Sequence, residues 1–332
     1  MNKALQQKIR VLFVLLPGVL LLLSGCITIN LFPEEKGIVE EVIEPSKSTN
    51  KILFLQVRGF IGDQTKKGGI PFMEGKVDQV SLLEKEFLKA SSDSKIKAIV
   101  LLVDSPGGTV TASDRLYHKV VQFRKKTGIP VLVFFGDLGA SGAYYLAMGA
   151  DEVWARPTSV VGSIGVMIAN VGFVGLMKKV GVTDRTIASG PEKEMGSPLR
   201  EMTSKDRTIF EGLVQDFYQK FLTVVEENRK MAPNKLKPLA DGRVYTASQA
   251  YSNGLVDRLG YQSDLVEHLK KKLGIDSVKL VRYKDESAES SSLLGMSAGG
   301  WDSLANESLL SFIRTLGPTP LYLWMPGGLT MK

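Results

Sequence analysis

Two apolar segments joined by a helical one constrain the fold more than any other part of this chain. The first segment, 96–103, ends in a continuous apolar run, which indicates a strand buried on both faces, as in a parallel sheet. A helical stretch, 111–126, follows, and a second apolar strand runs from 129 to 135. A strand, a helix and a parallel strand form a right-handed crossover. The sequence therefore predicts an α/β fold, with sites at the carboxyl ends of the strands.

Glycine-rich turns follow both of these strands. They are Asp104–Gly108 and Gly139–Gly142, and we expect the two turns to lie side by side. Ser141 stands at a strand-to-helix corner, beside free backbone N–H groups and the positive end of a helix. Acyl-transfer enzymes need this arrangement for a serine nucleophile and its oxyanion. The alternatives are that Ser141 only caps the helix and that Asp104–Gly108 is an ordinary tight turn.

Composition excludes several classes of site. Apolar residues make up 44% of the 332 residues and charged residues 23%, which indicates a folded body. Without Lys3, Lys8 and Arg10 the net charge of +7 falls to +4, and no basic stripe indicates nucleic-acid binding. Cys26 is the single cysteine, so no intramolecular disulfide is possible, and no Cys/His cluster has zinc spacing. We expect no metal and no nucleic-acid partner.

The two histidines are poor candidates for a general base. His118 and His268 both lie in stretches typical of solvated helix faces, which argues against a Ser-His-Asp triad. The chain also has no G-x-x-x-x-G-K-[ST] phosphate-binding loop. The sequence therefore predicts no cofactor.

The first 26 residues have the pattern of an export signal. A basic start, 3–10, precedes an almost wholly apolar stretch, 11–23, and the small residues Ser24 and Gly25 precede Cys26. This segment resembles the bacterial lipoprotein signal, in which the cysteine becomes the lipid-modified first mature residue. An uncleaved membrane helix is the alternative, since the apolar stretch is long enough to span a bilayer. Either interpretation places a membrane-anchored body outside the cytoplasm, in the bacterial cell envelope.

The rest of the chain divides into a tether, a body and a tail. We assign 1–25 to the leader, 26–50 to a polar tether, 51–283 to the catalytic domain and 284–332 to a flexible linker and apolar tail. Helical spacing of apolar residues predicts helices over 77–90, 171–180, 204–229, 263–273 and 304–316, and a strand is expected over 182–188. The apolar tail segment, 321–326, has three alternatives: no fixed structure, contact with a bilayer surface, or packing on a neighbouring subunit.

Five motifs follow one another between residues 104 and 245. They are Asp104–Gly108, Gly139–Tyr145, Gly162–Val166, Glu192–Met202 and Asp241–Tyr245. Together, and in this order, they resemble the signal peptide peptidase A (protease IV) family in its short, single-domain bacterial form, over residues 51–283.

The resemblance implies a fold and a set of site residues. The fold is that of the Clp protease and crotonase superfamily, with a mainly parallel sheet flanked by helices. Ser141 is the expected nucleophile and Lys193 the expected general base of a Ser-Lys dyad. The expected oxyanion donors are the N–H groups of Gly107 and Gly142, and Ser163 is expected to orient the lysine amine.

The resemblance makes a demand on the surroundings of Lys193. A lysine amine titrates near 10.4 in water, whereas a general base must be neutral, and desolvation is the available cause of neutrality. Glu192 and Glu194 flank the lysine, and a close carboxylate favours its charged form. We therefore predict that both glutamates face solvent while Lys193 turns inward.

The implied reaction is peptide hydrolysis through an acyl-enzyme, without metal or cofactor. The family's substrates are cleaved signal peptides or other membrane-associated peptides, bound as extended strands. The family also forms rings, so a homo-oligomer is expected, and whether the dyad forms within one subunit or between two stays open. Two alternatives remain: a crotonase-type acyl-CoA enzyme, and a catalytically silent, lipid-anchored scaffold.

Overall fold

The computed structural model describes residues 37–62, 79–285 and 320–324. The expected leader, the lipid attachment site at Cys26 and the expected helix over 304–316 lie outside these residues. Within the described part of the chain, no helix is both long and apolar enough to cross a bilayer. The same residues contain no group of three or more side chains that would hold a metal ion.

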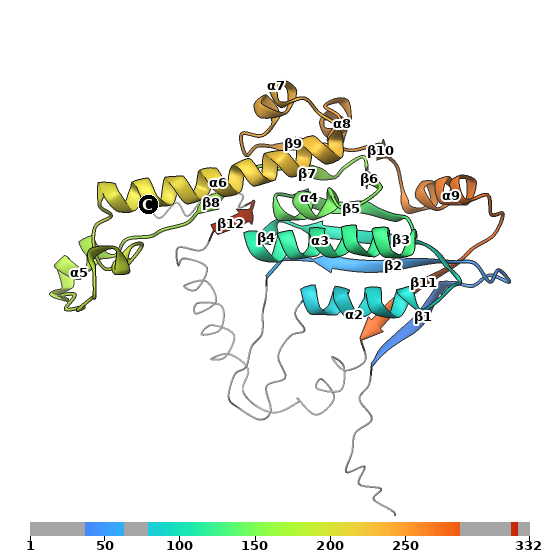
Figure 1. Cartoon of the computed structure of the whole chain (residues 1–332), viewed down its shortest axis with the longest axis horizontal. Coiled ribbons are helices and arrows are strands. Elements are labelled where there is room, and N and C mark those ends of the chain that lie inside the picture. Colours follow the sequence, from blue (N-terminus) through green and yellow to red (C-terminus); the bar gives the residue numbers. More distant parts are fainter. Residues whose placement is uncertain (1–36, 63–78, 286–319, 325–332) are drawn as a thin grey trace, which may run out of the picture. The chain divides into compact units, whose positions relative to one another are not determined.

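A mainly parallel sheet forms the centre of the body (Figure 1). Its order is β1-β11-β2-β3-β5-β6-β10, and only β1 at one edge runs antiparallel to its neighbour in this order. The strands are β1 (Ile38–Glu44), β2 (Lys51–Arg58), β3 (Ile96–Ser105), β5 (Val131–Ala140), β6 (Glu152–Ala155), β10 (Arg258–Leu259) and β11 (Lys279–Asp285).

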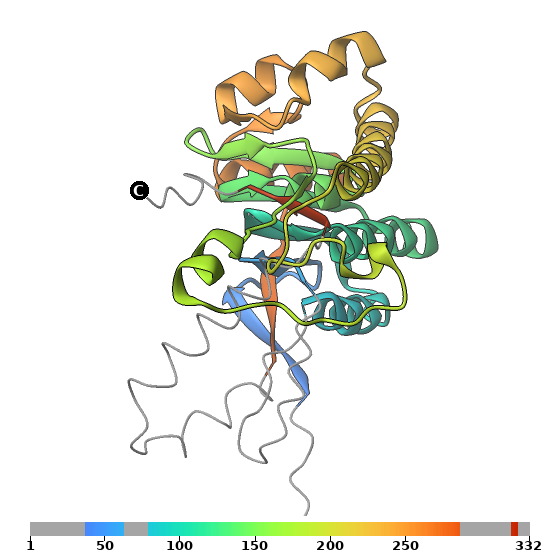
Figure 2. The same cartoon turned by 90° about the vertical axis from the view of Figure 1, so that its left-hand side faces the viewer.

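Helices cover both faces of this sheet, which confirms the expected α/β class. One face packs against α2 (Gln79–Ser91), α3 (Val110–Thr127), α4 (Gly142–Ala147) and α6 (Ser204–Arg229), and Figure 2 shows α2 and α3 stacked on that side. The other face packs against α9 (Gln262–Leu273). Alternate residues of β3 enter the two cores, so the apolar run is buried on both sides, as predicted.

A second set of strands lies at the carboxyl end of the main strands. The strands β7 (Val160–Gly162) and β9 (Val244–Thr246) extend the sheet beside the end of β5. A separate three-stranded sheet consists of β4 (Gly107–Thr109), β12 (Pro320–Leu323) and β8 (Met167–Ile168), with β12 in the middle. Short helical turns α7 (Pro233–Leu236), η2 (Lys237–Leu239) and α8 (Ala247–Ser252) connect α6 to β9 and β10.

One long segment, residues 169–203, leaves this body between β8 and α6. It contains α5 (Val174–Val180) and the 3-10 turn η1 (Pro191–Glu194), and neither of these has a buried residue. Figure 1 shows α5 beyond the end of the sheet, on the side of β8 and β12. We call residues 169–203 the α5–η1 segment.

Three expectations from the sequence differ from the structure. Residues 38–44, assigned to the tether, form β1, because their acidic side chains face a basic edge strand, as in the 2.8 Å pair of Glu41 and Arg282. Residues 182–188 form no strand, since Ile187 is 98% exposed and the stretch has no partner strand. The apolar tail is partly β12 of the same chain rather than a free segment.

Candidate active site

Ser141 lies where β5 ends and α4 begins, as the sequence predicted. It is 1% exposed. Its N–H donates to the carbonyl of Gly162 at 2.7 Å, and its carbonyl accepts from the N–H of Tyr145 at 2.9 Å. The Ser141 side chain makes no capping hydrogen bond to α4. The structure therefore does not support the alternative in which this serine only caps the helix.

The backbone of Ser141 is strained. Its φ of 54° and ψ of −115° match the first central residue of a type II′ turn, a position that normally takes glycine. A residue with a Cβ in such a conformation costs about 1–3 kcal/mol, which the surrounding hydrogen bonds must hold in place. Strain of this kind gathers at functional sites and aims the side chain out of the regular chain path.

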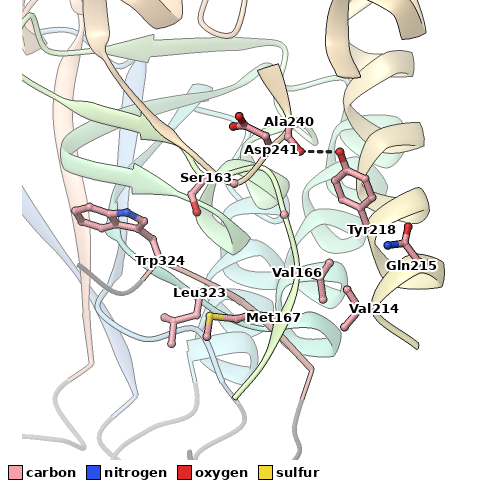
Figure 3. A pocket seen from close by; sticks show the side chains of 12 residues that line it. Ser163, Val166, Met167, Val214, Gln215, Tyr218, Ala240, Asp241, Leu323 and Trp324 are labelled. Carbon is pink, nitrogen blue, oxygen red and sulfur yellow. Dashed lines mark hydrogen bonds between the residues drawn. The ribbon is translucent and has the colours of Figure 1, made fainter. Parts of the chain in front are cut away.

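A second serine is held in the same way beside the first. Ala140 pairs with Gly162 in the parallel ladder of β5 and β7, so Ser141 and Ser163 both directly follow paired residues. Ser163 also has a positive φ, 52°, and its N–H donates to the carbonyl of Arg243 at 2.8 Å. Its side chain points into a pocket (Figure 3).

The two glycine-rich turns lie side by side, as predicted. Ser105 pairs with Gly139 in the ladder of β3 and β5. A Cβ built on Gly142 would lie 3.1 Å from the amide nitrogen of Gly108, so the Gly108 and Gly142 amides line one small space. A Cβ on Gly108 would lie 1.7 Å from the carbonyl oxygen of Ile61, which leaves no room for a side chain there.

Neighbouring amides in β4 face opposite sides. The N–H of Gly107 donates to Ser105 Oγ at 3.0 Å, so it is not a free donor. The carbonyl of Gly107 and the N–H of Thr109 both bond to Ile61, at 2.9 and 2.8 Å. Because strand residues alternate in direction, the N–H and carbonyl of Gly108 face the other way, toward β12. Gly108, rather than Gly107, therefore presents its amide on the β12 side. The sequence motif alone does not distinguish these two glycines.

Lys193 does not turn inward in this chain, so that prediction is wrong. It is exposed in η1, and the flanking glutamates pair with other cations. Glu192 contacts Lys205 at 2.5 Å and Glu194 contacts Arg200 at 3.8 Å. These partners compensate the two carboxylates whose charge would otherwise act on the lysine.

The ion pairs fix where η1 sits. They attach it to the first turn of α6, where Arg200 contacts Asp206 at 2.5 Å. Hydrogen bonding to Arg200 lowers the pKa of Asp206 to about 2. From Asp206 to Val214, the first α6 residue that lines the pocket, the helix rises about 12 Å. A lysine side chain spans only about 6 Å from Cα to Nζ.

The pocket beside Ser163 has a volume of about 530 Å³ (Figure 3). Its walls are residues 163–167, which follow β7, one side of α6, the turn at 240–242 and the end of β12. Tyr218 of α6 donates its hydroxyl to the carbonyl of Ala240 at 2.6 Å, which joins two of these walls. The side chains drawn include Ser163, Asp241, Tyr218, Leu323 and Trp324.

The histidines lie away from Ser141 or are already bonded. His268 of α9 contacts Glu152 at 3.0 Å and packs on Trp154 with ring centroids 5.3 Å apart. Glu152 pairs with Leu132, eight residues before Ala140, so about 25 Å of strand separates that contact from the nucleophile corner. His118 is exposed on α3.

Comparisons with known proteins decide the family. The family model described as Peptidase family S49 matches residues 123–276. The chain is 34% identical to the predicted signal peptide peptidase SppA of Enterococcus faecium over 90% of this chain and 88% of that protein. This chain belongs to peptidase family S49. As an S49 member it is a serine peptidase of the signal peptide peptidase type, which confirms the resemblance seen in the motifs.

Two further relatives place the S49 match in context. A predicted protease of Synechocystis is 35% identical over 72% of this chain and 81% of that protein. The chloroplastic serine protease SPPA of Arabidopsis thaliana is 33% identical over 71% of this chain and 34% of that longer protein. Among solved structures, the 1510-N membrane-bound stomatin-specific protease aligns at 14% identity with a TM-score of 0.42, over 66% of this chain and 84% of that one.

Proposed function

We propose that this S49 peptidase is a membrane-tethered serine endopeptidase with a Ser-Lys dyad, in which Ser141 is the nucleophile and Lys193 the general base. The observation that carries the proposal is the strained, buried and uncapped Ser141 beside two glycine amides. A serine held in this way serves no purpose in packing or capping. A reaction at its hydroxyl accounts for the strain.

We infer that the oxyanion donors are the N–H groups of Gly142 and Gly108. Gly142 follows the nucleophile and starts α4, so its amide is among those that the helix leaves unpaired. Gly108 replaces Gly107 in this role because the Gly107 amide already bonds to Ser105. Two preorganised amides aimed at one oxygen supply the electrostatic stabilisation that acyl transfer needs.

The base is proposed to come from a neighbouring copy of the chain. Lys193 is exposed, and η1 is attached to α6 about 12 Å along the helix from the pocket that Ser163 faces. The α5–η1 segment also exposes large apolar side chains that no other described part of the chain covers. They are Phe173, Leu176, Val180, Val182, Ile187, Leu199 and Met202. An exposed apolar surface of this kind is typical of a protein interface.

In the proposed assembly a second copy packs on the α5–η1 segment and receives its lysine. The Lys193 amine of one copy enters the 530 Å³ pocket of the next and meets the Ser163 hydroxyl, which points into that pocket. Removal from water favours the neutral amine that a base requires. Ser163 then acts as a positioning residue for that amine.

The reaction has two balanced steps. Lys193 accepts the Ser141 proton as Oγ forms a bond to the peptide carbonyl carbon, and the oxyanion sits between the Gly108 and Gly142 amides. The C–N bond breaks and the amine leaves with the proton from the lysine. Water, deprotonated by the same lysine, attacks the ester and releases the acid and Ser141.

The proposed substrates are cleaved signal peptides and other extended, membrane-associated peptides. The relatedness to a signal peptide peptidase and the edge strand β4, whose Gly108 lies beside Gly142, support a peptide bound as a strand. The Clp protease and crotonase type of fold, a lipid-modified Cys26 and a body outside the cytoplasm belong to the same proposal.

A serine-reactive fluorophosphonate probe tests the function. We expect covalent labelling of the full-length protein that disappears in Ser141→Ala and falls at least about a hundredfold in Lys193→Met, because the serine then lacks its base. Lys235→Met, at an exposed lysine of α7 outside the α5–η1 segment, is the matched control and should label like the wild type. A folded, assembled protein that does not label would favour the silent scaffold, and hydrolysis of acyl-CoA esters but not peptides would favour the crotonase alternative.

A further inference from the structure

Two consecutive glycines of β4 determine where one proposed oxyanion donor points. Gly107 has a φ of 100°, which glycine adopts without strain, and Gly108 approaches Ile61 too closely to carry a side chain. Glycine at both positions meets these two requirements. It also leaves the backbone free to rotate, because glycine has little conformational preference of its own. Contacts from outside β4 must therefore fix the direction of the Gly108 amide.

The main chain of Ile61 provides the first of these contacts. Its N–H donates to the Gly107 carbonyl at 2.9 Å, and its carbonyl accepts from the Thr109 N–H at 2.8 Å. Across a trans peptide bond, the carbonyl of one residue and the N–H of the next point in opposite directions. The bond from Ile61 to the Gly107 carbonyl therefore directs the Gly108 N–H away from Ile61, to the side on which Gly142 lies.

The Ser105 hydroxyl provides a second contact, and this one comes from a side chain. Ser105 is fully buried at the end of β3. Its Oγ accepts from the Gly107 N–H at 3.0 Å and donates to the Gly59 carbonyl at 2.6 Å. One hydroxyl thus joins β4 to residues 59–61, the same segment that contacts β4 through Ile61. Loss of this hydroxyl leaves the buried Gly107 N–H without its partner, and a buried amide in that state favours a rotated peptide that finds another acceptor.

We propose that Ser105 is a positioning residue of the active site, which holds the Gly108 amide at the angle that binds the oxyanion. This inference rests on the proposed peptidase function. Ser105 is neither the nucleophile, the base nor an oxyanion donor, and it acts through Gly107, the residue before the donor. An oxyanion donor contributes most when negative charge develops on the oxygen. A tilted Gly108 amide therefore weakens binding of the tetrahedral intermediate more than binding of the substrate.

Ser105→Ala in the full-length protein should separate these two kinds of binding. We expect kcat for a peptide substrate to fall about tenfold to a hundredfold while KM stays within about twofold, because loss of a whole oxyanion donor costs about a hundredfold or more. A peptide boronate forms a tetrahedral, negatively charged adduct with Ser141. Its inhibition constant should rise by about the factor by which kcat falls.

Ser159→Ala is the matched control. Ser159 is 1% exposed, and its hydroxyl also donates to a strand carbonyl, that of Phe135 at 3.3 Å, but it bonds to neither glycine of β4. Loss of this hydroxyl should lower the free energy of unfolding and leave the ratio of the boronate inhibition constant to KM unchanged. A role in stability alone would move that ratio in neither variant.

The outcomes distinguish this inference from the peptidase function. A wild type that neither hydrolyses peptides nor binds the boronate would overturn both. An active wild type beside a Ser105→Ala variant with unchanged kcat and boronate affinity would overturn the inference alone, as would equal losses of boronate and substrate binding. If Ser105→Ala does not fold, Ser105→Cys decides, because it keeps the volume with a weaker hydrogen-bonding group. It should raise the ratio of the boronate inhibition constant to KM severalfold, and an unchanged ratio would overturn the inference.

Discussion

At residue 141 the backbone holds a conformation that suits glycine, while the proposed chemistry needs serine. Replacement by glycine removes the strain, whereas replacement by alanine keeps it, and both remove the hydroxyl. We expect Ser141→Gly to exceed Ser141→Ala in free energy of unfolding by about 1 kcal/mol, measured by urea denaturation. The same pair at Ser113, inside α3, should show the reverse order, because glycine destabilises a helix. An alanine variant as stable as the glycine variant would show that residue 141 is unstrained.

Glu86 of α2 gives a second prediction at this scale. Burial, with the nearby Asp285 charge, raises the pKa of this carboxyl to about 8. The folded chain then keeps a proton that the unfolded chain releases near pH 4.5. The contribution of this proton to the free energy of unfolding is therefore full below pH 4.5 and is lost as the pH rises to about 8. Between pH 5 and 7.5 the free energy of unfolding should fall by about 3 kcal/mol less in Glu86→Gln than in the wild type. Urea denaturation at both pH values checks this difference. Glu84→Gln on the same helix is the control, and its free energy of unfolding should change between the two pH values as that of the wild type does.

The residues of the site differ in how far the sequence could identify them. Ser141 follows from turn chemistry, because it stands where an apolar strand meets a glycine-rich turn, whereas Ser163 was expected only from the family resemblance. The family resemblance gave Gly107 as an oxyanion donor, but the choice of glycine depends on which way each amide faces in β4, and the Gly107 amide donates to the Ser105 hydroxyl. The inward turn predicted for Lys193 is wrong, because η1 is held at the surface by ion pairs of its glutamates, Glu192 with Lys205 of α6 and Glu194 with Arg200 just before it.

The element that carries Lys193 is held by one buried carboxylate. Asp206 completes the capping box of α6 with Thr203 and binds Arg200, so it joins the α5–η1 segment to the helix. Asp206→Asn should misplace the segment and lower kcat/KM about tenfold to a hundredfold with Ser141 intact. Arg207→Ala is the control, because it removes only an exposed ion pair with Glu211 on the same helix. Activity unchanged in Asp206→Asn would separate the segment from catalysis.

The same carboxylate makes a pH prediction for the element. Because the Arg200 hydrogen bond lowers its pKa to about 2, the stabilising interaction is present above the unfolded pKa near 3.8 and is lost as the pH falls toward 2. The difference in unfolding midpoint between wild type and Asp206→Asn should therefore be constant at pH 5–7 and shrink below pH 4. A difference that persists at pH 2 would mean that packing, not charge, holds the cap.

The sequence pattern predicts some helices and strands better than others. The long helices and parallel strands were predicted within a few residues, as for α6, because periodicity and burial act along the element itself. The strands β1 and β12 were not, since each depends on a distant partner strand: acidic β1 on the basic edge of β11, and β12 on β4 and β8. Tertiary pairing, rather than local propensity, decides whether such strands form.

At the scale of the whole molecule, the proposed assembly completes the site of one chain with a lysine from another. The nucleophile, both proposed amide donors and the pocket lie on the body, whereas the proposed base lies on the exposed, apolar α5–η1 segment. Ile187→Asp should therefore lower both the oligomer size by light scattering and peptide hydrolysis, because a charge on a 98% exposed isoleucine acts only at an interface. A smaller oligomer with full activity would place the base within one chain.

Subunit mixing tests the shared dyad directly. Ser141→Ala and Lys193→Met chains are each inactive, but an oligomer assembled from both contains junctions with an intact serine on one copy and an intact lysine on the next. A ring with head-to-tail contacts and random mixing has about a quarter of its junctions intact, so co-expression should restore about that share of wild-type turnover. Co-expression of Ser141→Ala with the double variant supplies no intact serine and is the control. A mixed oligomer of full size that stays inactive would show that each chain must use its own lysine.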